Sequence, residues 1–92
     1  MPRVRRRVYY AGRVQGVGFR FTCHALARGY QVAGYVRNLT DGRVELVAEG
    51  EAQELENFLK AIELEMGTYI RNTDVETDST GSEPLDGFTI HH

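Results

Sequence analysis

A stretch of nine residues near the N-terminus combines small residues with positive charge in a way that suits an anion. It runs from Gly12 to Arg20, reads Gly-Arg-Val-Gln-Gly-Val-Gly-Phe-Arg, and has three glycines within its first seven residues. A glycine-rich turn that leads into a helix can aim several backbone N–H groups at one point, where the helix N-terminus adds partial positive charge. Arg20 adds a full charge and a planar fork of donors that fits phosphate or carboxylate. The stretch therefore predicts an oxyanion cradle.

Asn38 is the second residue whose type and position suit chemistry. It follows an alternating apolar run and precedes an Asp41-Gly42 turn. A neutral amide beside a bound phosphate can donate to and accept from a water molecule, whereas a carboxylate there would be repelled by the dianion. Asn38 is thus a candidate for holding an attacking water in line with the scissile bond. An asparagine beside a hairpin turn also fits ordinary turn chemistry, and both interpretations stay open here.

The residue sets that strong acid–base or metal catalysis needs do not accompany this pair. The sequence offers no Ser-His-Asp set, no paired carboxylates and no His/Cys cluster at ligand spacing, so we expect neither metal nor cofactor. We interpret His24 as an exposed or capping residue. The Lys-Ser/Thr ending of a nucleotide-binding Walker loop is missing, which excludes an ATPase. A carboxylic–phosphoric anhydride fits what remains, because its carboxylate, with a conjugate-acid pKa of about 4, leaves without a proton.

The elements that must position these residues alternate along the chain. Residue patterns with periods of 2 and 3.6 predict strands at about 5–12, 32–37, 44–49 and 68–78, a short strand at 88–90, and helices at about 19–28 and 51–66. Gly29 and Gly67 are expected to end the helices, and Gly50 to close the hairpin. The order β-α-β-β-α-β plus a short strand predicts an α+β, ferredoxin-like α/β sandwich. In this fold an antiparallel sheet carries two helices on one face.

This topology bears directly on the two candidate residues. The strands before and after the first helix run in the same direction, because a crossover joins them. The glycine-rich stretch follows the first of these strands, and Asn38 stands at the end of the second. We therefore expect the cradle and Asn38 at the same end of the sheet.

Size and composition limit the class of protein. The chain has 92 residues, 41% hydrophobic and 26% charged, which fits a single domain over residues 1–92. No apolar run approaches the roughly 20 residues of a membrane span, and none follows the basic N-terminus as in a signal peptide. The lone Cys23 cannot form an internal disulfide, and we expect it in the core. These features predict a cytoplasmic protein without a membrane partner, and the small size favours a monomer.

Charge is distributed unevenly along the chain. Seven of the eleven basic residues lie within residues 1–30, which contain no acid, and all thirteen acids follow residue 40. The cradle therefore belongs to the basic part, where an anionic ligand is favoured. The run Arg5-Arg6-Arg7 is either a nucleic-acid patch or a solvated strand entry, and we interpret it as solvated.

Two stretches resemble the signatures of the acylphosphatase family. Residues 12–20 resemble the first signature, G-x-V-Q-G-V-x-F-R. Gly34-Tyr35-Val36-Arg37-Asn38, with Gly42, Val44 and Gly50 at the expected spacings, resembles the second. A closing Gly87-Phe88-Thr89-Ile90 is similar to the family's usual end. The likeness covers the whole chain, and two long signatures together make it specific.

The resemblance implies an α/β-sandwich enzyme that hydrolyses small-molecule acyl phosphates to carboxylate and phosphate without a metal. By motif position, Arg20 is similar to the family's phosphate-binding arginine and Asn38 to its water-orienting asparagine. The phosphate cradle would be the backbone of Val14, Gln15, Gly16, Val17, Gly18 and Phe19. These implied roles agree with the chemistry that the residue types suggest.

Two other functions remain to be weighed. A close variant is an acylphosphatase-like domain that acts on carbamoyl phosphate within a larger assembly, which the length of 92 residues argues against. A different class is a non-catalytic ferredoxin-like module that binds an anion, or binds RNA through aromatic residues on its open sheet face. Tyr9, Tyr35 and the arginine run would serve such a module. The chain lacks the aromatic–basic octamer of RNA-binding sheets, so we expect no nucleic-acid partner.

Overall fold

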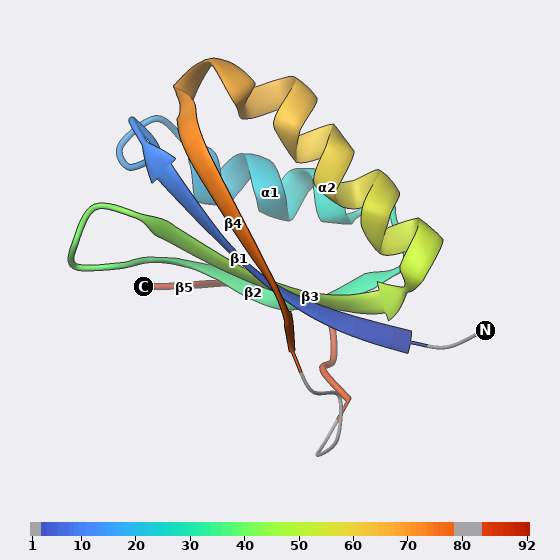
Figure 1. The fold of residues 1–92 in the computed structure, drawn as a ribbon. Helices are drawn as coiled ribbons and strands as arrows, with labels where there is room; N and C mark the ends of the chain where they lie inside the picture. The colour runs from blue at the N-terminus through green and yellow to red at the C-terminus, as the bar shows by residue number, and fades with distance from the viewer. Residues whose placement is uncertain (1–2, 79–83) are drawn as a thin grey trace.

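The computed structural model describes residues 3–78 and 84–92, which form a five-stranded sheet with both helices on one face (Figure 1). None of the helices in these residues is long and apolar enough to cross a membrane. Along the chain the elements are β1 (Arg3–Gly12), α1 (Phe19–Ala27), β2 (Val32–Asn38), β3 (Val44–Glu51), α2 (Ala52–Met66), the 3₁₀ turn η1 (Gly67–Tyr69), β4 (Ile70–Asp78) and β5 (Phe88–His91).

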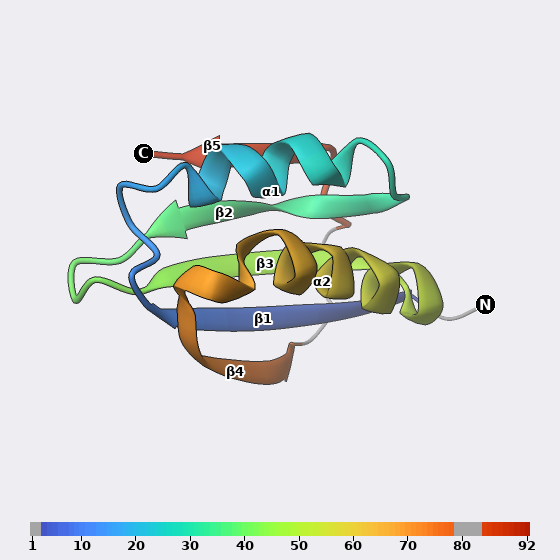
Figure 2. The same ribbon diagram turned by 90° about the horizontal axis from the view of Figure 1, so that it is seen from above.

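The strand order in the sheet is β4-β1-β3-β2-β5. β1 pairs antiparallel with β3 and β4, and β2 pairs antiparallel with β3. The predicted ferredoxin-like sandwich is thereby confirmed. β5 adds a parallel strand beside β2, a pairing that its short sequence did not indicate. Because β1 and β2 both oppose β3, they run in the same direction, and the loop after β1 lies at the end of the sheet where β2 ends (Figure 2).

Two of the three glycines that were expected to end elements act differently. α1 ends at Ala27 with Arg28 as its C-cap, before Gly29. α2 ends at Met66 with Gly67 as its C-cap, as expected, and the chain continues through η1 to β4, which begins at Ile70. Gly50 lies inside β3, where a Cβ atom would come within 2.8 Å of the Gln31 carbonyl oxygen. Gly50 therefore allows two strands to approach closely and does not close a hairpin.

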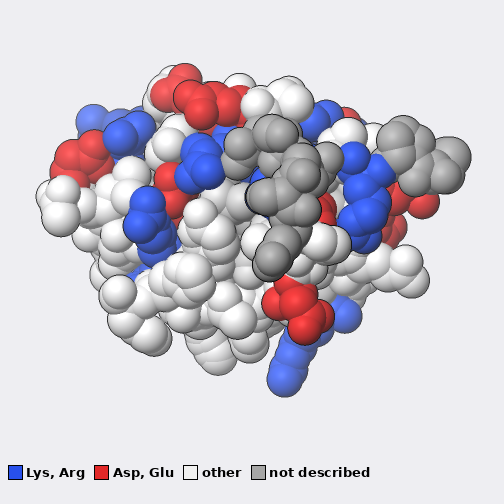
Figure 3. All heavy atoms as spheres, turned by 90° about the horizontal axis from the view of Figure 1, so that it is seen from below, with Lys and Arg blue, Asp and Glu red and all other residues white. Residues whose placement is uncertain are grey.

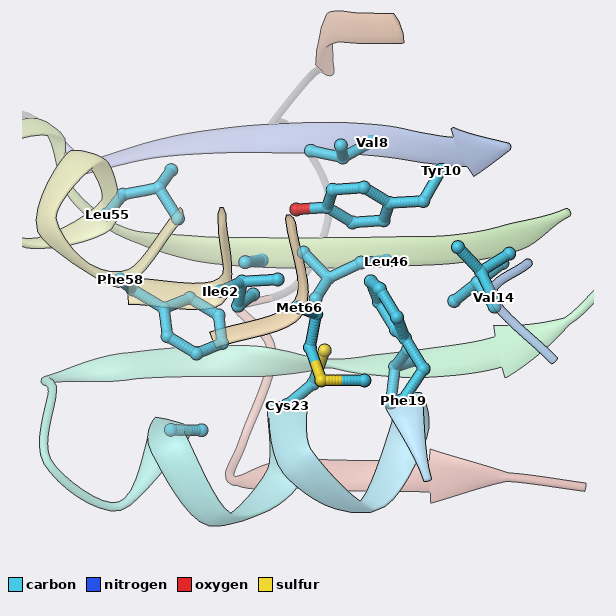
Figure 4. Close-up of a cluster of buried hydrophobic side chains, with 14 residues drawn as sticks. Val8, Tyr10, Val14, Phe19, Cys23, Leu46, Leu55, Phe58, Ile62 and Met66 are labelled. Carbon is cyan, nitrogen blue, oxygen red and sulfur yellow. The ribbon is translucent and has the colours of Figure 1, made fainter. Parts of the chain in front are cut away.

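The core lies between the helices and the sheet (Figure 4). Cys23 is fully buried there, as expected, and burial raises the pKa of its thiol to about 12. Two residues that flank the glycine-rich loop, Val14 and Phe19, are also buried. The Phe19 ring packs against Tyr10 with 5.0 Å between ring centroids. Both ends of the loop are thus anchored in the core.

The opposite face of the sheet is a network of paired charges. Glu45 and Glu49, each only 2% exposed, point outward from β3 beneath arginines of the neighbouring strands. Arg5 binds Glu49 with both Nε and Nη2, at 2.8 and 2.6 Å, and Arg7 Nη1 binds Glu45 at 2.8 Å. Blue and red side chains accordingly lie intermixed on this face (Figure 3).

This network corrects one expectation and bears on one alternative. The interpretation of Arg5 and Arg7 as solvated is wrong, because register with β3 places carboxylates beside both guanidinium groups. The backbone N–H of Leu85, in the segment before β5, also donates to Glu49 across this face. An RNA-binding sheet needs accessible cations and exposed aromatic rings. Here the cations are neutralised within the chain, so the RNA-binding alternative is not favoured.

Candidate active site

A pocket of about 230 Å³ lies where the loop between β1 and α1 meets the ends of β2 and β5. Arg20 and Asn38 both line it, although they come from α1 and β2. Figure 2 shows the start of α1 and the arrowheads of β2 and β5 at the same end as the loop. The full lining is Val14, Gly16, Gly18, Phe19, Arg20, Phe21, Asn38, Ile90 and His92.

Two glycines give the loop left-handed backbone dihedrals just before α1. Gly16 and Gly18 have φ angles of 79° and 78°, in the left-handed region that side chains disfavour. Gly18 is also the N-cap of α1, and its carbonyl accepts the Thr22 N–H at 2.9 Å. The first N–H groups of a helix have no partner within the helix and are available to a ligand. With Val14 and Phe19 fixed in the core, these groups are held at the pocket.

Arg20 is half-buried in the first turn of α1. Its Nη1 donates to the backbone carbonyl of His91 at 3.0 Å, so β5 helps to position the guanidinium. Among the described residues it has no carboxylate partner, and the pocket lining contains no acid. The positive charge of Arg20 is therefore left for an anion in the pocket.

Asn38 is the last residue of β2 and is exposed at the pocket. The turn that follows is closed by other groups: the Leu39 N–H donates to the Arg43 carbonyl at 2.8 Å and the Gly42 N–H to the Leu39 carbonyl at 3.2 Å. Asp41 accepts from the backbone and the side chain of Arg43, and these hydrogen bonds lower the pKa of its carboxyl. The Asn38 amide is not needed to close the turn.

Gln15 contributes its side chain in a way the sequence did not indicate. Its Nε2 donates to the carbonyl oxygens of Leu39 and Arg43, at 2.8 and 2.9 Å. These two hydrogen bonds hold the loop against the turn that begins immediately after Asn38. Gln15 and Val17 were both predicted in the cradle, yet neither lines the pocket, and Val17 packs against the core.

Three lining residues were absent from the sequence-based site: Phe21, Ile90 and His92. One feature of the sequence could have indicated Phe21, because it lies off the helix face that carries Phe19 and Cys23. Ile90 and His92 reach the pocket only because β5 pairs with β2, a long-range contact. His24, in the last turn of α1, is half-buried and outside the lining, which agrees with a non-catalytic residue.

The electrostatics of the pocket favour an anion over a metal ion. Among the described residues, Arg20 is the one arginine in the lining, which also contains the neutral amide of Asn38 and the glycine backbone. Within residues 3–78 and 84–92, no group of three or more His, Cys, Asp and Glu side chains is arranged to hold a metal ion. A phosphoryl group would find backbone donors, a guanidinium and an amide in one place.

Comparisons with known proteins agree with one another. The family model described as acylphosphatase matches residues 6–90. An acylphosphatase from Bacillus licheniformis is 44% identical over 82 residues, 89% of this chain and 88% of the relative. One from Pseudomonas aeruginosa is 42% identical over 87 residues, 95% and 91% of the two chains. The crystal structure of acylphosphatase from Bacillus subtilis, at 33% identity, matches with a TM-score of 0.85 and covers 97% of this chain and 99% of that one.

Proposed function

Because this chain belongs to the acylphosphatase family and is an acylphosphatase, a hydrolase acting on acyl phosphates, we propose that the pocket beside the β1–α1 loop is its active site. The observation that carries the proposal is that Arg20, Asn38 and the two left-handed glycines line one pocket. These groups come from separate elements, which the crossover from β1 through α1 to β2 brings to one end of the sheet.

In this proposal the loop and Arg20 hold the phosphoryl group of the substrate. The backbone N–H groups at the start of α1 bind its oxygens, and the Arg20 guanidinium neutralises their charge. The His91 carbonyl, 3.0 Å from Arg20 Nη1, keeps the guanidinium directed along the pocket. Because negative charge is spread over the three equatorial phosphoryl oxygens in the transition state, donors fixed around the phosphoryl group also stabilise that state.

Asn38 orients the attacking water. Its amide oxygen accepts one hydrogen from the water and thereby directs a lone pair of the water oxygen toward phosphorus. A bond forms between the water oxygen and phosphorus, and the bond from phosphorus to the acyl oxygen breaks. The acyl group departs as a carboxylate, and the water's second proton passes to an oxygen of the phosphoryl group. The atoms and charges balance without an acid, a base or a metal ion, because the carboxylate is a weak base.

The test is hydrolysis of benzoyl phosphate by the purified chain in the presence of a metal chelator. We expect turnover to persist with the chelator and to fall by roughly 100-fold or more in Asn38→Ala, since the water loses its guide. Inhibition by inorganic phosphate should survive in Asn38→Ala, because the cradle and Arg20 are intact.

Asn57→Ala is the matched control, since Asn57 is an exposed asparagine on α2, away from the pocket. We expect it to keep wild-type turnover. Loss of turnover with the chelator, or an equal loss in both asparagine variants, would overturn the proposed mechanism.

The setting of the enzyme is part of the same proposal: a single domain over residues 1–92 that acts as a monomer in the cytoplasm. The buried free thiol of Cys23 is compatible with a reducing compartment. The large apolar side chains exposed in the described part, Phe21, Leu64 and Val75, lie on three different elements, which gives weak support to a monomer. Light scattering during gel filtration would test it, since a monomer has a mass of 10.4 kDa.

A further inference from the structure

Phe21 is the aromatic side chain at the active-site pocket that the mechanism does not use. It is 63% exposed, whereas Phe19, two residues earlier, is 2% exposed. Leu64 and Val75 are the other large apolar residues exposed in the described part, and neither lines this pocket. An exposed phenylalanine lacks the favourable free energy that burial of its ring would give. A ligand that covers the ring would recover part of it.

The lining of the pocket includes both polar and apolar groups. The glycine backbone, Arg20 and Asn38 are polar groups, which hold the phosphoryl group and the attacking water in the proposed mechanism. Phe21 and Ile90 offer only hydrocarbon to the same pocket. A doubly charged phosphoryl group gains nothing from hydrocarbon. The apolar groups therefore suit the one remaining portion of the substrate, its acyl group.

The volume and charge of the pocket further restrict the kind of acyl group that it can bind. A cavity of about 150 Å³ holds a benzene ring, so about 230 Å³ has room for a phosphoryl group and part of a ring. Arg20 is the one arginine in the lining and is engaged by the phosphoryl group. Arg13 and Arg71 line a separate pocket with Gly12. Among the described residues that line the pocket, an acyl group with its own carboxylate or phosphate would find no second guanidinium or ammonium group.

We propose that Phe21, together with Ile90, binds the acyl group of the substrate, so that the enzyme prefers acyl phosphates with a bulky apolar or aromatic acyl group over acetyl phosphate. The inference rests on the proposed function, since it assigns the remaining part of the same pocket. Contact between the Phe21 ring and an aromatic acyl group buries apolar surface on both sides and favours offset or edge-to-face packing. Acetyl offers one methyl group to the same surface.

The test compares benzoyl phosphate with acetyl phosphate in wild type, Phe21→Ala and Phe21→Leu. We expect the wild-type kcat/KM to be higher for benzoyl phosphate. In Phe21→Ala the ratio of kcat/KM for benzoyl over acetyl phosphate should fall by about five- to tenfold, mainly through a raised KM for benzoyl phosphate. Phe21→Leu should recover part of the ratio, because its side chain still offers apolar surface.

Leu64→Ala is the matched control, because Leu64 is 88% exposed on α2 and outside the pocket. We expect its ratio to equal that of wild type. A ratio unchanged in Phe21→Ala, or lowered equally in Leu64→Ala, would overturn the inference.

The two proposals fail in different ways. Wild-type hydrolysis of both substrates that depends on Asn38 but shows no benzoyl preference would remove only the role of Phe21. Absence of hydrolysis of either substrate would overturn the proposed function and this inference with it.

Discussion

The arginines at the pocket and the arginines on the open face of the sheet show opposite uses of the same side chain. Arg5 is 12% exposed and binds Glu49 through two nitrogens, at 2.8 and 2.6 Å. Arg20 contacts a backbone carbonyl and, in the described part of the chain, no carboxylate. The charge of Arg5 is neutralised by a carboxylate within the fold, whereas the charge of Arg20 is available to a ligand. A basic N-terminal segment therefore does not by itself mark a binding surface.

The reason for the difference lies in the elements that carry each arginine. β1 pairs with β3 along its length, so side chains on one face of β1 lie beside side chains on the same face of β3, and that face of β3 carries Glu45 and Glu49. Arg20 stands at the start of a helix next to a glycine loop, where small residues leave space in place of partners. Strand pairing thus supplies Arg5 with a carboxylate partner, whereas the start of α1 supplies none to Arg20 among the described residues.

The strongest test of this comparison replaces each of the two arginines with alanine in turn. Arg20→Ala should lower kcat/KM for benzoyl phosphate by roughly 1,000-fold or more and abolish inhibition by inorganic phosphate, because the charge-assisted contact to the phosphoryl group is lost. Arg5→Ala should keep kcat/KM and lower the free energy of unfolding by about 2 kcal/mol, because Glu49 loses a partner. Steady-state kinetics and urea unfolding of both variants measure the two effects.

Arg28→Ala serves as the control for Arg20, since Arg28 is an exposed arginine at the other end of α1. We expect it to match wild type in both measurements. Equal phosphate inhibition in wild type and Arg20→Ala would contradict the role of Arg20 and remove the contrast between the two regions.

A weaker effect is expected at Gln15, which links the pocket to the rest of the fold. Gln15→Met removes both donated hydrogen bonds at similar size, and Gln15→Glu replaces the donor with a charge that the Leu39 and Arg43 carbonyls repel. We expect kcat to fall by roughly tenfold in Gln15→Met and further in Gln15→Glu, because the loop loses its fixed distance to Asn38. Inhibition by phosphate should change much less, since the cradle itself remains.

Gln53→Met is the control, because Gln53 is an exposed glutamine on α2. Its kcat should equal that of wild type. If Gln15→Met retained wild-type kcat, or lost phosphate inhibition in proportion to kcat, Gln15 would not act by positioning the loop relative to Asn38.

These residues also show which features the sequence could predict. The glycine loop, Arg20 and Asn38 were accessible because each depends on local spacing and on the direction of two strands joined by a crossover. The side-chain bonds of Gln15 and the contribution of Ile90 depend on contacts across 24 or more residues and on the pairing of β5 with β2. Local patterns carry no information on such pairing.

The arginine run is an intermediate case. Arg5 and Arg7 lie two residues apart and Glu45 and Glu49 lie four apart, so each pair shares one face of its strand. Both strands were predicted, so the components of the network were present in the sequence. The register between β1 and β3 was missing, and a shift of one residue would have turned the carboxylates to the other face. The sequence therefore indicated the charges correctly, and only the structure showed that they are paired.

The smallest predicted effect is a dependence of the free energy of unfolding on pH. It involves the open face of the sheet and not the pocket. Burial opposes ionisation of Glu49, but hydrogen bonds from Arg3, Arg5 and the Leu85 N–H outweigh it and lower the pKa of its carboxyl. A carboxyl whose pKa is lower in the folded state contributes stability that is complete above its ordinary pKa of 4.5 and is lost as the pH falls through the folded value. The free energy of unfolding should therefore stay level down to about pH 5 and decline below it.

Glu49→Gln should lower the free energy of unfolding by about 1 kcal/mol at pH 7 and leave kcat/KM unchanged, because Glu49 lies outside the pocket. The gap between wild type and this variant should narrow as the pH falls below 4.5 and through the lower pKa of folded Glu49, where the wild-type carboxyl also becomes neutral. Glu56→Gln, an exposed position on α2, should follow the wild-type curve throughout. Urea unfolding between pH 3 and pH 7 measures all three. A constant gap at every pH would mean that the ionisation of Glu49 contributes nothing and that the gap comes from replacing an acceptor oxygen with an amide NH2 group. The contrast between the open face and the pocket would then not rest on the charge of Glu49.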